Sequence, residues 1–352
     1  MSYKNTNPSD SPRRILIVRL SAMGDVIHTL PAVARIRRTF PGARITWLIA
    51  PTWAPLLADN RCIDEVIEVP TAVWRKRPLS LSTWSEAARL RRRLRATGFD
   101  VAIDFQGLVK SALLARISGA ARVYGFARRE LREPLARVFY SNRIETTAPH
   151  VVDKNLALAE ALGAANGAIE FPLPQGKPQR DLPAGEFVLA SPVAGWKSKQ
   201  WTPEYYAKLA ELLHQRTAMT LVLDCAAADR VYCEQIRRLA PAGSCHLHVS
   251  QLEGLIAATR RARAVIGVDS GPLHLAAALG IRGVAIFGQT DPARNGPYGK
   301  SFRVLRAPDA LTSYKRVDDL APSMAAIQPE DVWLALEPLL ASQAPSAAGK
   351  SR

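Results

Sequence analysis

The first residues that could do chemistry lie in the loop after an apolar run, RILIVRL (14–20). Gly24 allows the backbone to turn sharply there, and Asp25 begins the expected helix. An aspartate in this position either caps the helix, worth about 1 kcal/mol, or acts as a general base. Ligands of open α/β sheets bind outside the carboxyl ends of the strands, which favours the base. His28, on the same side of the helix, is either its partner or a structural residue.

A pair of lysines lies in a second loop, after the apolar run FVLASP (187–192). Lys197 and Lys199 precede Thr202 and Pro203, which open a helix as its N-cap and its first residue. Cations beside the amide groups of a helix N-terminus suit a diphosphate, and a solvated lysine pair is the alternative. This loop therefore indicates where an anion could bind.

The most distinctive motif is AVIGVDSGPLHLAAALG (264–280), which predicts a buried strand, a tight turn and an Ala-rich helix. Asp269, Ser270 and His274 converge on the start of this helix, and Gly271 lets a ligand approach its amide groups. Asp269 could simply cap the helix, but three such side chains exceed what capping requires. A Ser-His-Asp hydrolase is disfavoured because no GxSxG motif is present. We expect an anion site with a carboxylate beside it.

Continuous apolar runs supply the strands that would hold these loops. Such runs are typical of parallel strands that helices cover on both faces. They occur at 14–20, 45–50, 64–69, 100–105, 187–192, 219–225, 264–269 and 283–288, and helix-length segments lie at 29–39, 84–96, 203–216 and 252–261. The alternation predicts βαβ units and hence a doubly wound α/β fold. No GxGxxG follows the first strand, which disfavours a dinucleotide oxidoreductase.

The series of strands and helices is interrupted by FPLPQGKPQRDLPAGE (171–186), whose Pro, Gly and charge predict a linker. We expect a Rossmann-like lobe over 13–172, a linker over 173–186 and a second Rossmann-like lobe over 187–325, facing each other across a cleft. A C-terminal helix is expected over 326–341. The polar ends, 1–12 and 342–352, are expected to be flexible tails.

The composition is that of a globular protein, with 352 residues of which 48% are apolar and 22% charged. No run approaches the roughly 18 apolar residues of a membrane-spanning helix, and residues 1–12 lack the apolar core of a secretory signal. We therefore expect a cytoplasmic protein. The 4 cysteines form no CxxC pair, which argues against disulfides and a zinc site.

Basic residues outnumber acidic ones by 47 to 31, a net charge of +16. Residues 1–172 carry +11 of this charge and residues 173–352 carry +5. The first half is thus expected to face an anionic partner, which could be nucleic acid, an anionic membrane surface or a phosphorylated substrate.

Five segments together resemble the ADP-heptose:lipopolysaccharide heptosyltransferases of glycosyltransferase family nine, most of all the heptosyltransferase I type. They are LSAMGDVIHTLP (20–31), DFQGLVKS (104–111), REPLA (132–136), KQW (199–201) and DSGPLH (269–274), in the order that the family has. The resemblance implies a GT-B fold and a C-terminal helix that can cross back to the first lobe. It also implies an inverting, metal-independent transfer of heptose from ADP-heptose to a Kdo residue of Kdo-lipid A, without a cofactor.

The same resemblance implies roles for individual residues. Asp25 is similar to the catalytic base that takes the proton of the acceptor hydroxyl, and Lys199 to the lysine that binds the donor diphosphate. Further donor-binding positions match Asp269, Ser270, Gly271 and His274, and acceptor-binding positions match Ser21, Gly24, Lys110 and Arg132. The donor loop at 192–198 departs from the family because it lacks the Thr-Thr pair of some members.

Two basic runs, at 75–77 and 89–95, allow more than one interpretation. They could bind nucleic acid, but no aromatic residues are interleaved with them as in such motifs. We favour contact with anionic lipid headgroups, at about 1 kcal/mol for each cation near the surface. This predicts a peripheral protein on the inner face of the cytoplasmic membrane, with no nucleic-acid partner. Transfer to a heptose or another acceptor, or from another nucleotide sugar, stays open.

Overall fold

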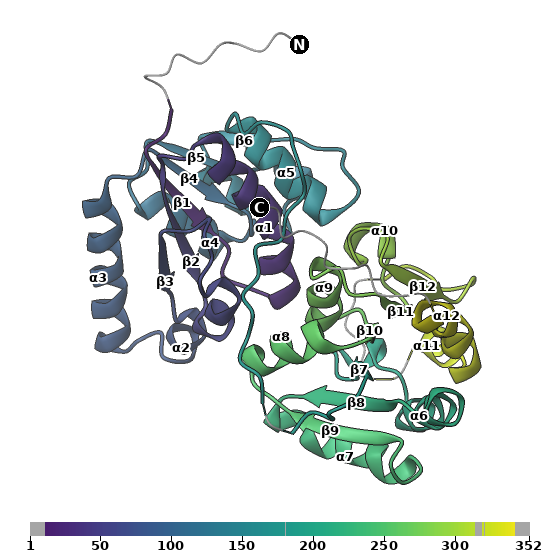
Figure 1. Cartoon of the computed structure of the whole chain (residues 1–352). Helices are drawn as coiled ribbons and strands as arrows, with labels where there is room; N and C mark the ends of the chain where they lie inside the picture. Colours follow the sequence, from purple (N-terminus) through teal and green to yellow (C-terminus); the bar gives the residue numbers. More distant parts are fainter. Residues whose placement is uncertain (1–10, 180, 314–318, 320, 342–352) are drawn as a thin grey trace, which may run out of the picture. The chain divides into compact units, whose positions relative to one another are not determined.

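The computed structural model describes residues 11–179, 181–313, 319 and 321–341. The chain divides into two compact units, Met1–Pro174 and Gln175–Arg352, each built on one parallel sheet of six strands (Figure 1). Of the expected tails, 1–10 and 342–352 lie outside the described residues. No helix among the described residues has the length and apolar character needed to cross a membrane.

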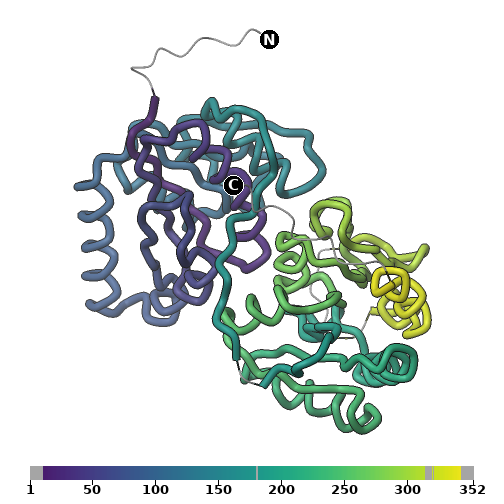
Figure 2. The backbone as a smooth tube through the Cα atoms, in the orientation of Figure 1, coloured from purple at the N-terminus to yellow at the C-terminus, as the bar shows by residue number. Residues whose placement is uncertain are grey.

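The first unit alternates strands with helices in the expected manner. Its strands are β1 (Arg14–Val18), β2 (Arg44–Ile49), β3 (Glu65–Glu68), β4 (Val101–Asp104), β5 (Arg122–Phe126) and β6 (Asn142–Ile144). Its α-helices are α1 (Met23–Thr39), α2 (Thr71–Lys76), α3 (Leu81–Thr97), α4 (Val109–Ile117) and α5 (Val151–Ala161), and its 3-10 helices are η2 (Pro51–Leu57), η3 (Arg128–Glu130) and η4 (Pro134–Phe139). Helices α1 and α5 pack side by side, as the tube in Figure 2 also shows.

The second unit repeats this plan. Its strands are β7 (Phe187–Ser191), β8 (Thr220–Cys225), β9 (Cys245–Val249), β10 (Ala264–Val268), β11 (Gly283–Phe287) and β12 (Phe302–Arg306). Its helices are η5 (Lys197–Lys199), α6 (Pro203–Thr217), η6 (Ala227–Asp229), α7 (Arg230–Leu239), α8 (Leu252–Arg261), α9 (Gly271–Ala278), α10 (Pro292–Asn295), α11 (Pro322–Ala325) and α12 (Pro329–Ala341).

Strand order is the feature that positions the candidate residues. The first sheet runs β3-β2-β1-β4-β5-β6, and the second runs β12-β11-β10-β7-β8-β9, which is the same order read from its other edge. In each sheet the direction of winding reverses beside the unit's first strand, between β1 and β4 or between β7 and β10. Ligands of doubly wound sheets bind at this point, outside the carboxyl ends of the strands. The loops after these four strands are therefore where binding groups belong.

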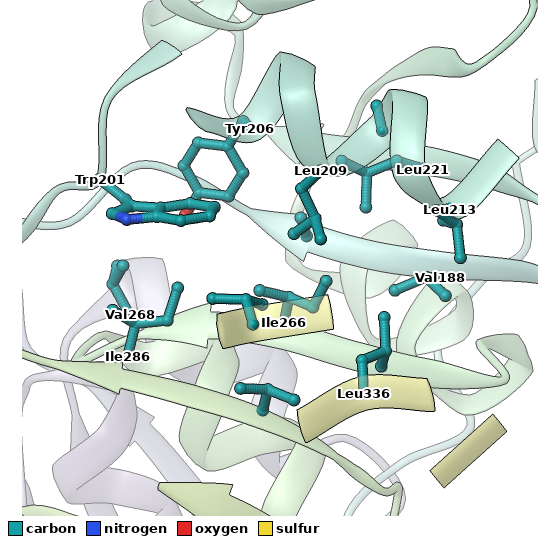
Figure 3. Packing of buried hydrophobic residues seen from close by; sticks show 14 of the residues in the cluster. Val188, Trp201, Tyr206, Leu209, Leu213, Leu221, Ile266, Val268, Ile286 and Leu336 are labelled. Atoms are coloured by element: carbon teal, nitrogen blue, oxygen red, sulfur yellow. The ribbon is translucent and has the colours of Figure 1, made fainter. Parts of the chain in front are cut away.

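Both faces of the second sheet are covered, as the continuous apolar runs predict. Val284 and Ile286 of β11 pack in a core with helices α6 and α12, whereas the alternate residues Ala285 and Phe287 pack with Leu273 of α9. Figure 3 shows part of the larger core, in which the indole of Trp201 meets other buried apolar side chains of this unit.

The segment after Pro174 and the C-terminal helix both pack against the second unit. The chain after Pro174 lies against the second unit, where the amide of Lys177 donates to the carbonyl of Glu253 at 3.0 Å. Helix α12 packs on α6 and strands β10 to β12, and Trp333 and Leu336 are buried in the second unit's core. The apolar face of α12 is thus covered by its own unit, and the expectation that this helix can cross back to the first lobe stays a prediction.

Candidate functional site

Asp25 lies in the first turn of α1, directly after the loop that leaves β1. Its Oδ1 forms an ion pair with Nη2 of Arg19 at 2.6 Å, and its Oδ2 accepts from the amide of Ala22 at 3.2 Å. The Arg19 side chain is only 7% exposed, whereas that of Asp25 is 46% exposed. A buried cation thus holds a carboxylate that solvent and a ligand can still reach.

Arg19 is the residue of this loop that sequence reasoning passed over. Its Nη1 donates to the carbonyl of Phe105, and its own carbonyl accepts from the indole of Trp47 at 3.0 Å. Next to it, the amide of Leu20 donates to Oε1 of Gln106 at 2.9 Å. These bonds tie the loop after β1 to the loop after β4, at the point where the winding reverses. The only signal in the sequence was a basic residue at the end of an apolar strand.

Asp104, at the end of β4, organises the second of these loops from inside. It accepts hydrogen bonds from the hydroxyls of Tyr140 and Ser111, at 2.6 and 2.9 Å, and from the amides of Gln106 and Gly107. Burial raises the pKa of this carboxyl above its usual value, although the four donors oppose the rise. Asp104 is fully buried, so its part is to fix the loop.

The four residues expected to bind the acceptor lie on the loop after β1, at the starts of α1 and α4, and on the segment between η3 and η4. Ser21 is half-buried and Gly24 is buried in the first turn of α1. Lys110 is exposed in the first turn of α4, and Arg132 is exposed on the segment between η3 and η4. The carboxylate of Glu133 accepts from the amide of Val109 at 2.7 Å, which brings the two cationic segments next to each other.

His28 was expected to be either a partner of Asp25 or a structural residue, and its surroundings favour the structural role. It is buried, and its ring meets that of His150 edge to face, with 5.5 Å between the ring centres. Asn155 of α5 donates to the carbonyl of His28 at 3.0 Å. The residue therefore packs at the junction of α1 and α5.

Lys199 is the central cation of the second unit's loops. Its Nζ lies 2.5 Å from Oδ2 of Asp269 and 4.3 Å from the ring centre of Trp196. The lysine side chain is 15% exposed and that of Asp269 is 6% exposed. Lys197, the other lysine of the loop, is exposed and takes no part in this ion pair. Of the two lysines that the sequence singled out, Lys199 is thus held in an ion pair and Lys197 lies at the surface.

Asp269 gathers the remaining side chains of the motif. It accepts from the hydroxyl of Thr290 at 2.7 Å, and Nε2 of His274 lies 3.7 Å from its Oδ1. Burial alone would raise the pKa of Asp269, but the hydrogen bond from His274 and the charge of Lys199 outweigh it and hold the pKa far below its usual range. The carboxylate is therefore ionised throughout the physiological range and fixes three other side chains.

Ser270 and Gly271 form the start of α9 directly after this carboxylate. The Ser270 hydroxyl is buried, and within the described residues it makes no hydrogen bond, so it caps no amide of the helix. The first amide groups of a helix bind anions well, and here a cation lies beside them. The four expected donor-binding residues and Lys199 thus form one cluster.

Two further polar residues, Gln289 and Thr290, lie beside the cluster at the same edge of the sheet. Gln289 donates through Nε2 to the hydroxyl of Ser198 at 3.1 Å, and Thr290 reaches Asp269. Both follow β11, the neighbour of β10 in the sheet. Among the described residues, no group of three or more His, Cys, Asp or Glu side chains is arranged to hold a metal ion.

Comparison with known proteins places these features in a family context. The model of glycosyltransferase family 9 (heptosyltransferase) matches residues 87–322. Lipopolysaccharide heptosyltransferase 1 of Pseudomonas aeruginosa is 33% identical over 300 residues, which is 82% of each chain. The protein of the same name from Escherichia coli K12 is also 33% identical, over 84% of this chain and 94% of its own.

Solved structures agree with the sequence relatives. E. coli heptosyltransferase WaaC with ADP superposes with a TM-score of 0.79 at 29% identity, over 93% of this chain and 99% of that one. E. coli ADP-heptose lipopolysaccharide heptosyltransferase II shares the fold, with a TM-score of 0.74 at 22% identity over 93% and 98% of the two chains. These matches confirm the expected GT-B fold, with two Rossmann-like units.

Proposed function

Because the chain belongs to glycosyltransferase family 9, the heptosyltransferases, we propose that it transfers heptose from ADP-heptose to a Kdo residue of Kdo-lipid A. It is a glycosyltransferase of lipopolysaccharide core synthesis.

The observation that carries the choice of donor is the cluster of Lys199, Asp269 and Ser270 at the start of α9. It combines one ordered cation, a buried hydroxyl and the amide groups of a helix N-terminus. Such a set suits a diphosphate, whose charge it neutralises. The WaaC structures with ADP and with ADP-2-deoxy-2-fluoro heptose support a nucleotide diphosphate sugar in a related protein.

In the proposed reaction, an acceptor hydroxyl attacks the anomeric carbon of the heptose. Its proton passes to the carboxylate of Asp25, the new glycosidic bond forms, and the bond from the anomeric carbon to the diphosphate oxygen breaks. A single displacement of this kind inverts the anomeric centre. Negative charge develops on the departing ADP, where Lys199 and the amides of α9 stabilise it without a metal ion. Arg19 keeps the Asp25 carboxylate in place through the 2.6 Å ion pair.

The acceptor side is proposed to use Ser21, Gly24, Lys110 and Arg132. Kdo carries a carboxylate and lipid A carries phosphates, so two exposed cations on adjacent segments offer suitable partners. A heptose acceptor remains the alternative within the same enzyme class. We also propose that the protein acts as a peripheral protein on the membrane face that displays its lipid acceptor.

The test is to incubate the purified protein with ADP-heptose and a panel of acceptors, and to weigh the products. We expect an increase of one heptose on Kdo-lipid A and release of ADP. The same assay with an acceptor that already carries heptose distinguishes the alternative. If only the acceptor that already carries heptose gains mass, the proposed acceptor is wrong, while the donor and the reaction type stand.

A further inference from the structure

We propose that the exposed side of segment 71–97, formed by α2, the following loop and α3, is the surface by which this enzyme docks on an anionic lipid bilayer. The inference deepens the proposed function, since it rests on a lipid acceptor and adds the residues that meet the membrane. Figure 1 shows α2 and α3 beside the strands of the first unit.

Apolar side chains are exposed together at one end of this segment. Leu79 is 92% exposed, Leu81 87% and Trp84 65%, and Val73 of α2 is half exposed. Single exposed apolar residues need no explanation, but here four are exposed within twelve positions of the chain. Tryptophan in particular is favoured where a lipid bilayer meets water, because its ring is apolar and its N–H is polar.

Helix α3 is divided into an inner and an outer face. Glu86, Leu90 and Leu94 are half-buried or buried on the inner face, where the Glu86 carboxylate accepts from the indole of Trp74 at 2.9 Å. The outer face carries exposed residues that follow one another every three or four positions, as one side of a helix requires. They are Leu81, Trp84, Ala88, Arg91, Arg92 and Arg95. An apolar start thus leads into a basic stripe on the same side of the helix.

The charge of the segment is almost entirely of one sign. Residues 71–97 contain eight basic side chains, Arg75, Lys76, Arg77, Arg89, Arg91, Arg92, Arg93 and Arg95, and one acidic side chain, Glu86. Within the described part of the chain, only Arg93 among these cations forms an ion pair, with Glu65 at 2.7 Å. A helix whose arginines lack acidic partners usually either binds an anionic partner or faces only water. A face that meets only water does not explain the exposed apolar residues beside the arginines, whereas an anionic partner with an apolar interior does.

An anionic bilayer accounts for both properties at once. Headgroup phosphates would contact the arginines, and the side chains of Leu79, Leu81 and Trp84 would enter the boundary between headgroups and acyl chains. Nucleic acid would account for the charge but not for three exposed apolar side chains, since only one of them has a ring on which a base could stack. A second copy of the chain would face the same excess of positive charge and be repelled.

The experiment is flotation of the whole protein with vesicles of phosphatidylcholine, with and without phosphatidylglycerol, at low and high ionic strength. Arg91→Gln/Arg92→Gln should lower partitioning onto the anionic vesicles at least tenfold at low salt, since each cation near the surface contributes about fivefold. Leu81→Ser/Trp84→Ser should lower partitioning onto both kinds of vesicle, and the loss should persist at high salt.

Helix α7 offers matched controls in the second unit. Arg237 and Arg238 form an exposed basic pair, and Val231 and Leu239 are exposed apolar residues, 81% and 50%. Arg237→Gln/Arg238→Gln and Val231→Ser/Leu239→Ser should change partitioning less than twofold. Equal losses in the α3 and α7 variants, or a wild-type protein that stays below the vesicles, would overturn the proposal. Retention of RNA in place of vesicles, abolished by the α3 variants, would assign the surface to nucleic acid and overturn it as well.

Transfer assays separate this inference from the function on which it rests. With a water-soluble Kdo acceptor without acyl chains, all four variants should turn over at the wild-type rate. With lipid acceptor in anionic vesicles, only the α3 variants should slow, by tenfold or more. If the wild type transfers heptose to neither acceptor and flotation still behaves as expected, the proposed function fails and the docking surface stands. If transfer is normal and flotation does not respond to the α3 variants, the docking surface alone fails.

Discussion

Replacement of Lys199 by alanine should weaken ADP binding and destabilise the second unit at the same time. The lysine side chain is 15% exposed and already held by Asp269, so little order has to be gained when a diphosphate binds. A hydrogen bond from a charged donor contributes about 1.5–3 kcal/mol. The Kd for ADP should therefore rise roughly tenfold to a hundredfold.

The loss of stability follows from Asp269, whose carboxylate stays buried when its cation is gone. Removing one partner of a buried pair costs about 3–5 kcal/mol. The hydroxyl of Thr290 and the ring of His274 remain near the carboxylate, and Lys199 is not fully buried. We expect a loss of about 2 kcal/mol, below that range. For a unit of this size the Tm should fall by roughly 4–8 °C.

The stability difference should depend on pH in one direction. Burial raises the pKa of Asp269, but His274 and Lys199 lower it by more. The pKa in the folded protein therefore lies below the value in the unfolded chain, which is about 3.9. The contribution of the pair is then complete above about pH 4 and is lost as the pH falls through the folded pKa. The gap between wild type and Lys199→Ala, present at pH 7, should narrow in acid.

Titration calorimetry with ADP and scanning calorimetry measure the two effects on the same samples. Lys197→Ala is the matched control, because Lys197 is exposed in the same loop and lies outside the ion pair. Its ADP affinity should stay within about threefold of wild type and its Tm should be unchanged. Equal effects of the two substitutions on ADP affinity would refute the assignment of Lys199 to the diphosphate. An unchanged Tm in Lys199→Ala would refute the role of the pair in stability.

Three further substitutions test the first unit. Asp25→Asn should lower kcat by about a hundredfold to ten thousandfold while the Kd for ADP is kept, and near-normal turnover would show that another group is the base. Arg19→Gln should lower kcat by about tenfold to a hundredfold with unchanged ADP affinity, and Arg19→Lys should restore part of the lost kcat. A kcat equal to wild type in Arg19→Gln would rule out a positioning role. Gly125→Ala would place a Cβ 2.3 Å from the Tyr140 ring and should cost about 1–3 kcal/mol in a denaturant titration. Gly42→Ala, where nothing lies within 4 Å, should be close to neutral, and equal costs would contradict the packing argument.

Most strands could be predicted from the sequence because they are buried on both faces. β1, β4, β7, β8, β10 and β11 agree with the apolar runs, as do β2 and the edge strand β3. β5 and the sheet edges β6, β9 and β12 were missed. Most residues of the three edge strands are only half-buried, so their sequences mix polar and apolar residues. β5 is buried except at Arg122, but its sequence, RVYGF, is not a continuous apolar run. The sequence also carries no direct signal for strand order, which is what brings the loops after β1 and β4 together.

The candidate residues were easier to identify than their partners. Asp25, Lys199 and Asp269 stand in short motifs at strand ends, where residue type and position both point to binding. Arg19 and Thr290 act through contacts with residues six and twenty-one positions away in the chain. No local pattern marks such pairs, since they depend on how the loops fold back on one another. Helix α12 covers Pro329–Ala341, and the surface on which it packs depends on tertiary contacts that no local pattern marks.

Asp104 and Asp269 show why position alone does not assign a role. Both lie at the carboxyl end of the fourth strand of their sheets, and both are buried. The hydrogen-bond donors recorded for Asp104 are all neutral, so burial dominates and raises its pKa. Asp269 faces His274 and Lys199, which together lower its pKa, and the side chain of Lys199 stays partly exposed. A carboxylate at the end of the fourth strand therefore fixes a loop in one unit, and in the other it holds the cation that we propose for the donor diphosphate. The difference lies in the side chains that face each carboxylate.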